Sequence, residues 1–291
     1  MTSIRYKGAV IVNAFWRGGD AGAENIAAEL RKRDMNVSVL GTDELFLRID
    51  DGVRGEYALD FAVFLDKDMH VARMLEESGV RLFNSAESIR LADDKMLTHI
   101  ALTAAGIPQP RTISSPLCFT DGEDDFADTV ERELGYPIVV KNCYGAFGRQ
   151  VWLVKNKEEL LAKRAELRRE PHIYQEYVEC GAQDIRVIVI GGTPVAAMRR
   201  HAAAGEFRAN AELGGTGEAI ALTEELSSLA VRSADALGLC YAGVDILESD
   251  RGYLVTEVNS NAGFRLINKT TGVDVASLYA DYIASKLRKG E

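Results

Sequence analysis

Residues 243–259 read GVDILESDRGYLVTEVN, and this stretch decides the fold of the C-terminal part of the chain. Two apolar, β-rich runs flank the polar turn Ser249-Asp250-Arg251-Gly252, a pattern that predicts a β-hairpin. Because side chains alternate along a strand, Glu257 and Asn259 share one face. Folding the chain about the turn places Asp245 nearly opposite Glu257.

Two carboxylates and an amide oxygen would then converge from neighbouring strands in apolar surroundings. Like charges at such a distance repel strongly unless a cation lies between them. A set of oxygen ligands favours Mg²⁺ bridged to phosphates over zinc. The hairpin therefore predicts a metal site made of Asp245, Glu257 and Asn259, and the alternative is a solvated hairpin face without a ligand.

A second pattern joins a strand, a lysine and a glycine loop. The strand Pro137-Ile138-Val139-Val140-Lys141 is followed by a loop that contains Gly145 and Gly148, and a strand resumes at Val151. Glycines let backbone N–H groups approach phosphate oxygens, and the lysine supplies a compact positive charge. No G-K-[ST] opens a helix here, so the loop is not a Walker A motif. The alternative is a tight hairpin without a ligand.

Arginines gather around a predicted strand pair, at Arg186, Arg199-Arg200 and Arg208. The guanidinium group suits a two-pronged grip on a carboxylate or a transferring phosphate, although any one of these residues alone reads as a surface arginine.

The β-rich segment Gln175-Glu176-Tyr177-Val178 is able to present backbone groups to an adenine edge. The alternative is a strand without a special role.

The order of predicted strands and helices divides the chain into an α/β part and an α+β part. The first ninety residues alternate strands and helices, which predicts a small parallel sheet covered on both faces. After a helix at 93–105 the chain is mainly strand, which predicts antiparallel sheet carrying helices. The strands are expected at 9–12, 37–40, 61–65, 80–83, 137–142, 151–154, 173–178, 185–190, 194–200, 241–247 and 253–259, and further helices at 23–33, 69–77, 157–169, 224–237 and 274–286.

Composition excludes several classes of protein. The 291 residues suggest about two domains. A net charge of −10 argues against a protein that coats DNA or RNA, because phosphate binding leaves a basic footprint. The four scattered cysteines fit neither a zinc site nor a disulfide framework. Without a signal peptide or a membrane span, we expect a soluble cytoplasmic protein with no nucleic-acid or membrane partner.

Taken in order along the chain, these motifs resemble the RimK-like ATP-grasp ligases, the α-L-glutamate ligase family. The motifs are Asp94-Lys95, Val140-Lys141 with Gly145 and Gly148, Gln175-Glu176-Tyr177-Val178, Asp184-Ile185-Arg186, Gly205-Glu206-Phe207-Arg208-Ala209-Asn210, Gly243-Val244-Asp245-Ile246-Leu247, Glu257-Val258-Asn259 and Lys269-Thr270-Thr271-Gly272-Val273-Asp274. The resemblance covers the C-terminal two-thirds. It implies an ATP-grasp fold with an N-terminal βα (pre-ATP-grasp) domain at 1–90, a lid and central subdomain at 91–184 and a catalytic subdomain at 185–291.

The resemblance also implies a role for each motif residue. Lys95 and Lys141 would grip the ATP phosphates, with the loop from Gly145 to Gly148 as a lid. Gln175, Glu176, Tyr177 and Val178 would line the adenine, and Asp184 would reach the ribose. Asp245, Glu257 and Asn259 would hold two Mg²⁺ ions, with Mn²⁺ as an alternative. The residues implied to face the reacting carboxylate and the γ-phosphate are Arg186, Arg200, Arg208 and Asn210.

The activity implied is an ATP-dependent carboxylate–amine ligase. A carboxylate on a small molecule or peptide would be phosphorylated and then attacked by an amine or amino acid, with release of ADP and phosphate. The alternative is an ATP-binding regulatory or partner protein of the same fold without ligase activity. A homo-oligomer is left open.

The chain departs from the family pattern near the substrate. Glu212-Leu213 stands where the family usually has His-Arg, and His201 replaces its usual second base after Arg200. Asn259-Ser260-Asn261-Ala262-Gly263 replaces Asn-x-Ser-Pro-Gly. A closed pocket holding an extra carboxylate needs a paired base. The departures therefore predict a substrate pocket near His201, Glu212 and Leu213 that favours a less acidic substrate than glutamate or a glutamate-ended peptide. The alternative is that this loop faces solvent and does not select the substrate.

Overall fold

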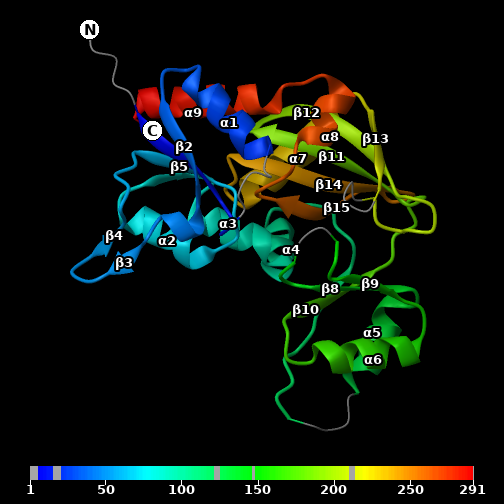
Figure 1. Ribbon diagram of the computed structural model, residues 1–291. Helices are drawn as coiled ribbons and strands as arrows, with labels where there is room; N and C mark the ends of the chain where they lie inside the picture. Colours follow the sequence, from blue (N-terminus) through cyan, green and yellow to red (C-terminus); the bar gives the residue numbers. More distant parts are fainter. Residues whose placement is uncertain (1–5, 16–20, 121–124, 146–147, 210–213, 291) are drawn as a thin grey trace.

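The structure, a computed structural model, describes residues 6–15, 21–120, 125–145, 148–209 and 214–290. Within these ranges the chain builds three main sheets, each with its own helices, as Figure 1 shows. The predicted change from parallel to antiparallel sheet is confirmed, because the first sheet is parallel and the next two are antiparallel.

The N-terminal sheet has the strand order β2-β1-β5-β6. Its strands are β1 (Lys7–Val12), β2 (Asn36–Gly41), β5 (Phe61–Phe64) and β6 (Arg81–Phe83), and its helices are α1 (Ala21–Arg31), α2 (Met69–Glu77) and α3 (Ala86–Asp93). Successive residues of β1 enter two different cores, with Val10 on the side of α1 and Ile11 on the side of α2 and α3. Both faces of the sheet are therefore covered, as the sequence predicts. A short 3₁₀ turn η1 (Thr42–Glu44) and the small hairpin of β3 (Arg48–Ile49) and β4 (Val53–Arg54) were not predicted.

The second sheet has the strand order β7-β10-β8-β9. Its strands are β7 (Thr112–Ser114), β8 (Ile138–Asn142), β9 (Val151–Val154) and β10 (His172–Glu176), with helices α5 (Phe126–Leu134) and α6 (Lys157–Leu167) on one face. Val130, Ile138 and Leu160 pack together in the core between these helices and the sheet. The other face looks toward the C-terminal sheet (Figure 1).

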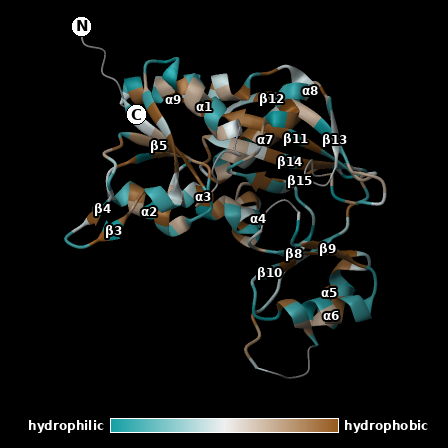
Figure 2. Ribbon diagram, viewed as in Figure 1, coloured by the Kyte–Doolittle hydropathy of each residue, from teal (hydrophilic) through white to brown (hydrophobic). Residues whose placement is uncertain are grey.

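The C-terminal sheet is antiparallel and has the strand order β13-β12-β11-β14-β15. Its strands are β11 (Gln183–Ile190), β12 (Thr193–His201), β13 (Thr216–Ala219), β14 (Tyr241–Ser249) and β15 (Gly252–Asn259). Helix α7 (Glu224–Ala236) packs on one face, and α8 (Arg265–Thr271) and α9 (Val275–Lys289) pack on the other. Figure 2 shows apolar residues concentrated in the strands, while the helices alternate polar and apolar residues, as expected for layers that share cores.

Helix α4 (Lys95–Ala104) begins with Lys95, a predicted site residue, and its far end is anchored in the C-terminal core. The Asp94 side chain caps the helix by accepting hydrogen bonds from the backbone N–H groups of Met96 and Leu97. Leu102 then packs among residues of β11, β14 and α7.

We propose that the chain divides into three domains at the predicted bounds, 1–90, 91–184 and 185–291. The C-terminal sheet itself starts at Gln183.

Asn84 joins the N-terminal sheet to the C-terminal sheet. The side chain is 2% exposed, and its Nδ2 donates to the carbonyl oxygens of Tyr241 (2.8 Å) and Ser260 (3.0 Å). Its Oδ1 accepts from the backbone N–H groups of Cys240 (2.7 Å) and Tyr241 (3.0 Å). One side chain therefore satisfies four backbone groups next to the predicted catalytic hairpin.

Across the described ranges, no helix has the length and apolar character needed to cross a membrane.

The first prediction concerns this link. Asn84→Ala should lower the free energy of unfolding by about 2–4 kcal/mol, because it leaves buried backbone groups without partners. Urea denaturation followed by circular dichroism measures the change. The exposed Asn36→Ala serves as the control and should stay within about 0.5 kcal/mol of the unchanged protein. Equal stability of the two variants would show that the four hydrogen bonds do not hold the sheets together.

Candidate active site

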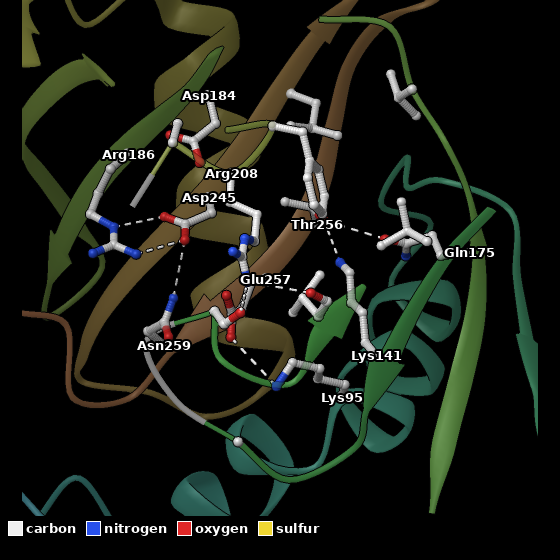
Figure 3. Close-up of a pocket in the computed structure, with 18 of the residues that line it drawn as sticks. Lys95, Lys141, Gln175, Asp184, Arg186, Arg208, Asp245, Thr256, Glu257 and Asn259 are labelled. Carbon is white, nitrogen blue, oxygen red and sulfur yellow. Dashed lines mark hydrogen bonds and ion pairs between the residues drawn. The ribbon is translucent and has the colours of Figure 1, made fainter. Parts of the chain in front are cut away.

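A cavity of about 250 Å³ lies between the second sheet and the C-terminal sheet, and Figure 3 shows it in close-up. The structure brings most of the predicted site residues to its wall. These are Lys95, Lys141, Gly145, Gly148, Gln175, Glu176, Tyr177, Val178, Asp184, Arg186, Arg208, Asp245, Glu257 and Asn259. Two predicted residues are not among them: Arg200 lies behind the wall, and Asn210 lies outside the described residues.

The hairpin of β14 and β15 carries a bulge that sets the geometry of the site. Leu247 pairs with Leu254 and Ile246 with Val255, but the next pair is Asp245 with Glu257, so Thr256 is an extra residue. A bulge lets two consecutive side chains point toward the same side of a sheet. Thr256 and Glu257 both line the cavity as a result. The predicted placement of Asp245 opposite Glu257 is confirmed.

Four charged side chains form a network across β12, β11 and β14. Arg200 Nε and Nη2 donate to the two carboxylate oxygens of Asp184, each at 2.6 Å. Arg186 Nε and Nη2 donate to the carboxylate of Asp245 at 2.7 and 2.6 Å. Arg200 also lies 3.0 Å from Asp245 and ties the two pairs together. Arg200 is only 2% exposed, so in this structure it orients carboxylates instead of facing the cavity.

The network fixes the charge of Asp245. Burial alone would raise the pKa of this carboxyl group, but the charges and hydrogen bonds of Arg186 and Arg200 outweigh burial, and its pKa is lowered. Burial raises the pKa of Asp184 more than Arg200 lowers it. Asp245, a buried carboxylate that Arg186 and Arg200 keep ionised, is therefore a strong oxygen donor for a cation.

Glu257 and Asn259 complete the predicted metal-binding set. Lys95 Nζ lies 3.8 Å from Glu257 Oε1, and Asn259 Nδ2 lies 3.4 Å from Asp245 Oδ2. Nowhere in the described part of the chain do three or more His, Cys, Asp or Glu side chains cluster as a metal site. Two carboxylates and one amide oxygen fit Mg²⁺, which takes few protein ligands and completes its shell with phosphate and water. The same set does not fit zinc.

Lys141 is the most unusual cation at the cavity. It is buried at the end of β8, and its Nζ donates to Thr256 Oγ1 at 3.0 Å. Among the described residues it has no acidic partner within ion-pair distance. Burial lowers the pKa of Lys141 to about 8, with the nearby charge of Lys95 acting in the same direction. A buried ammonium group with donors to spare is stabilised by an anion, so this part of the cavity is suited to a phosphate.

The glycine loop after β8 is held at both ends. Lys67, which follows β5, donates from Nζ to the carbonyl oxygen of Gly145 at 3.1 Å and also pairs with Asp93. Arg208 donates from Nη1 to the carbonyl oxygen of Gly148. Gly148 has a φ of 68°, which glycine adopts without strain. Residues from the N-terminal and C-terminal parts of the chain therefore meet at this loop.

Arg208 is oriented in turn by Glu206. The guanidinium group forms a two-pronged pair with Glu206, with distances of 2.9 and 2.6 Å. The hydrogen bonds from Arg208 lower the pKa of Glu206 to about 2, so the pair remains charged at any ordinary pH.

The segment Gln175–Val178 leaves the end of β10 and forms one edge of the cavity. Glu176 accepts from Arg111 Nε at 2.9 Å and from Arg251 Nη2 at 2.6 Å, which fixes the strand end in place. Apolar side chains of this wall come from Val139, Val151, Val178 and Leu247. An apolar wall of this kind suits a flat heterocyclic base.

Sequence reasoning missed several polar residues of the wall, among them Lys67 and Thr256. Lys67 follows a predicted strand in the N-terminal part, but nothing in the sequence indicates that this strand end faces the glycine loop. Thr256 directly precedes Glu257, so strict alternation would place the two side chains on opposite faces, and only the bulge lets both of them line the cavity.

Two of the departures from the family pattern can be placed. In the segment 259–263, Asn261, Ala262 and Gly263 line the cavity, whereas His201 does not. The Nε2 atom of His201 is 3.6 Å from Glu218 Oε2 on the neighbouring strand. Glu212 and Leu213 lie outside the described residues. The structure therefore gives no support to the expectation that His201, Glu212 and Leu213 select a less acidic substrate.

Known proteins resemble this chain in sequence and in fold. The family model of the RimK-like ATP-grasp domain matches residues 92–283. The chain belongs to the RimK-like ATP-grasp family. Human β-citrylglutamate synthase B is 33% identical over 286 residues, which cover 91% of this chain and 73% of that protein. A probable α-L-glutamate ligase from Xanthomonas euvesicatoria is 39% identical over 225 residues, covering 75% of this chain and 74% of that protein.

A solved structure shows the same fold. The crystal structure of a RimK domain ATP-grasp protein from Sphaerobacter thermophilus has a TM-score of 0.75 at 22% identity and covers 95% of this chain and 98% of that chain. The predicted ATP-grasp fold is confirmed, and the protein is an ATP-dependent carboxylate–amine ligase. The non-catalytic alternative is set aside, because the family is one of ligases.

The hairpin yields the second prediction. Glu257→Ala should lower turnover by more than about a thousandfold, because charge stabilisation by a bound metal contributes several kcal/mol to the transition state. Initial rates of ADP release measure the loss. Glu248→Ala removes an exposed carboxylate from the same hairpin and should leave the rate within about twofold. Activity of Glu257→Ala within about tenfold of the unchanged ligase would mean that the hairpin does not hold the metal.

Lys141 yields the third prediction. Its lowered pKa means that the free ligase loses this positive charge as the pH rises through about 8, well below the ordinary 10.5 of lysine. The kcat/KM for ATP should therefore fall above pH 8, since this parameter reports ionisations of the free enzyme. Lys141→Arg, which stays charged, should remove that fall even if its rate is lower. A pH profile of unchanged shape in Lys141→Arg would assign the ionisation to another group.

Proposed function

We propose that this ligase joins the carboxylate of a small molecule or peptide to the amine of an amino acid, through an acyl phosphate and with release of ADP and phosphate. The observation that carries the proposal is the buried ammonium group of Lys141, which lacks an acidic partner among the described residues and lies near the Asp245–Glu257 pair. Cations without counter-charges next to fixed carboxylates suit a phosphate chain together with its metal.

Each part of the cavity suits one part of Mg·ATP. Lys95 and Lys141 suit the phosphates, and the loop from Gly145 to Gly148 suits the role of lid above them. The apolar wall at Val139 and Leu247 suits the adenine, with Gln175, Glu176, Tyr177 and Val178 along its edge. Asp184 is proposed to reach the ribose, although in this structure Arg200 holds its carboxylate.

Asp245, Glu257 and Asn259 would hold Mg²⁺, as two ions or with Mn²⁺ in its place. The metal would neutralise phosphate charge that develops during phosphoryl transfer.

The residues of the protein then position two successive steps. A carboxylate oxygen of the substrate attacks the γ-phosphorus, and the bond to ADP breaks. The amine next attacks the acyl carbon, loses a proton, and phosphate leaves. Arg186 and Arg208 lie at the cavity wall, where their guanidinium groups suit the reacting carboxylate and phosphate; Asn210 is proposed to assist them. A lid tied at Gly145 and Gly148 keeps water from the acyl phosphate.

We propose glutamate as the amine. The support comes from the relatives, since β-citrylglutamate synthase B and the probable α-L-glutamate ligase are both named for glutamate.

The protein is proposed to act in the cytoplasm, in keeping with its four free cysteines.

The fourth prediction tests the reaction type. Incubation with Mg·ATP, glutamate and a pool of carboxylic acids should yield ADP and phosphate in equal amounts, because the γ-phosphate is the group transferred. Nucleotide analysis by chromatography distinguishes this from AMP and pyrophosphate, which would contradict the acyl-phosphate route. Glutamine at the same concentration is the matched control for glutamate. Equal incorporation of the two amino acids would contradict the proposed amine.

A further inference from the structure

A chain of hydrogen bonds runs from the back of helix α4 to the Lys141 ammonium group. Its members are Gln109, His99, Gln175, Thr256 and Lys141. His99 is 3% exposed and Gln175 is 2% exposed, whereas Gln109 is partly exposed at a shallow surface pocket on the far side of α4. Figure 3 shows the cavity end, where Gln175, Thr256 and Lys141 meet.

The direction of every bond in the chain is fixed from its outer end. Gln109 Nε2 donates to the backbone carbonyl oxygen of His99 at 3.0 Å, and a carbonyl can only accept. The Gln109 oxygen must therefore face His99 Nδ1, at 2.5 Å, so Nδ1 carries the proton. His99 Nε2 is then an acceptor, and Gln175 Nε2 donates to it at 3.1 Å. The backbone carbonyl oxygen of His99 thus orients the Gln109 amide, and that amide determines which nitrogen of the buried imidazole carries the proton.

The same orientation of Gln175 is supported by Thr112. The Thr112 hydroxyl donates to the carbonyl oxygen of Pro110 at 2.9 Å, so its oxygen accepts from Gln175 Nε2 at 2.9 Å. With both donors of its amide used inside the protein, Gln175 presents its oxygen to the cavity. The Thr256 hydroxyl donates to that oxygen at 3.5 Å, the longest bond of the chain, and accepts from Lys141 Nζ at 3.0 Å.

We propose that His99 is a positioning residue that sets the place of the Lys141 ammonium group through the Gln175 amide and the Thr256 hydroxyl. The proposal rests on the proposed function, in which Lys141 binds ATP phosphate. If the Gln175 amide turned over, its N–H groups would face Thr256. The Thr256 oxygen would then accept from Gln175 as well as from Lys141, and the ammonium group would lose its fixed place.

The protonation state of His99 agrees with this role. Burial lowers the pKa of His99 to about 4, and the charge of Lys141 acts in the same direction. The imidazole is therefore neutral around pH 7, as an acceptor at Nε2 requires.

The first test is independent of activity. Nitrogen-15 spectra of the full-length ligase at pH 7 distinguish protonated from unprotonated ring nitrogens, and the chain has only four histidines to assign. His99 should be neutral with its proton on Nδ1. A proton on Nε2, or on both nitrogens, would overturn the proposal.

The second test uses Gln109→Glu, which changes a partly exposed residue outside the cavity wall. The new carboxylate would pair with Nδ1–H and favour a second proton on Nε2, which turns that atom from an acceptor into a donor. The KM for ATP should rise about tenfold, while kcat stays within about threefold of the unchanged ligase. The reason is that the misplaced Lys141 ammonium group weakens its hydrogen bond to ATP equally in the ground state and in the transition state. Ile100→Glu adds the same charge to α4 at the exposed neighbouring position, outside the hydrogen-bond chain, and should leave the KM unchanged.

The outcomes separate a positioning role from simple packing. A merely structural role of His99 would lower the active fraction and so the apparent kcat, with no change in the KM for ATP; that result in Gln109→Glu would overturn the proposal. An equal rise in KM for Ile100→Glu would also overturn it, because the effect would be one of general charge. If the unchanged protein releases no ADP, the proposed function fails, while the spectra still decide the tautomer of His99.

Discussion

The carboxylate of Asp245 lies on β14, in the interior of the C-terminal sheet, with 3% of the residue exposed. A lone charge at such depth costs several kcal/mol, so its neighbours must compensate for it. Arg186 on the adjoining strand β11 and Arg200 on the next strand, β12, do so, and Asp184 balances Arg200. The order β12-β11-β14 within the sheet is therefore also the order of a charge network. Placing an ionised oxygen donor at the cavity wall requires these three strands in this register.

The bulge at Thr256 builds on that arrangement. In a regular hairpin Thr256 would pair with Asp245, and Glu257 would face the opposite side of the sheet. The extra residue brings Glu257 beside Asp245 and leaves the Thr256 hydroxyl facing Lys141 on β8. One irregularity in backbone pairing thus supplies both the carboxylate of the proposed metal site and the contact that orients Lys141, the proposed phosphate-binding lysine. The second sheet and the C-terminal sheet meet at this contact.

Much of this could be read from the sequence, because it depends on local pattern. The turn at residues 249–252 brings Asp245 close to Glu257 along the hairpin, although the sequence does not show the bulge that puts both on one face. The strand that carries Lys141 is equally plain. Other features depend on contacts between distant segments. Nothing in residues 60–70 indicates that Lys67 reaches the carbonyl oxygen of Gly145, and nothing near His99 indicates a bond to Gln175. Arg200 illustrates the difference: the sequence marks it as an arginine near the site, but only the register with Asp184 shows that it faces inward.

The paired carboxylates and the buried lysine are proposed to bind a nucleotide together with a metal. Crystals grown with ADP and Mn²⁺ test this proposal most directly, because the anomalous scattering of manganese locates the ion independently of the model. We expect an anomalous peak within coordination distance of Asp245 and Glu257, with the diphosphate in contact with Lys141. A diphosphate bound elsewhere, or a manganese ion away from the hairpin while Arg186 still holds Asp245, would contradict it.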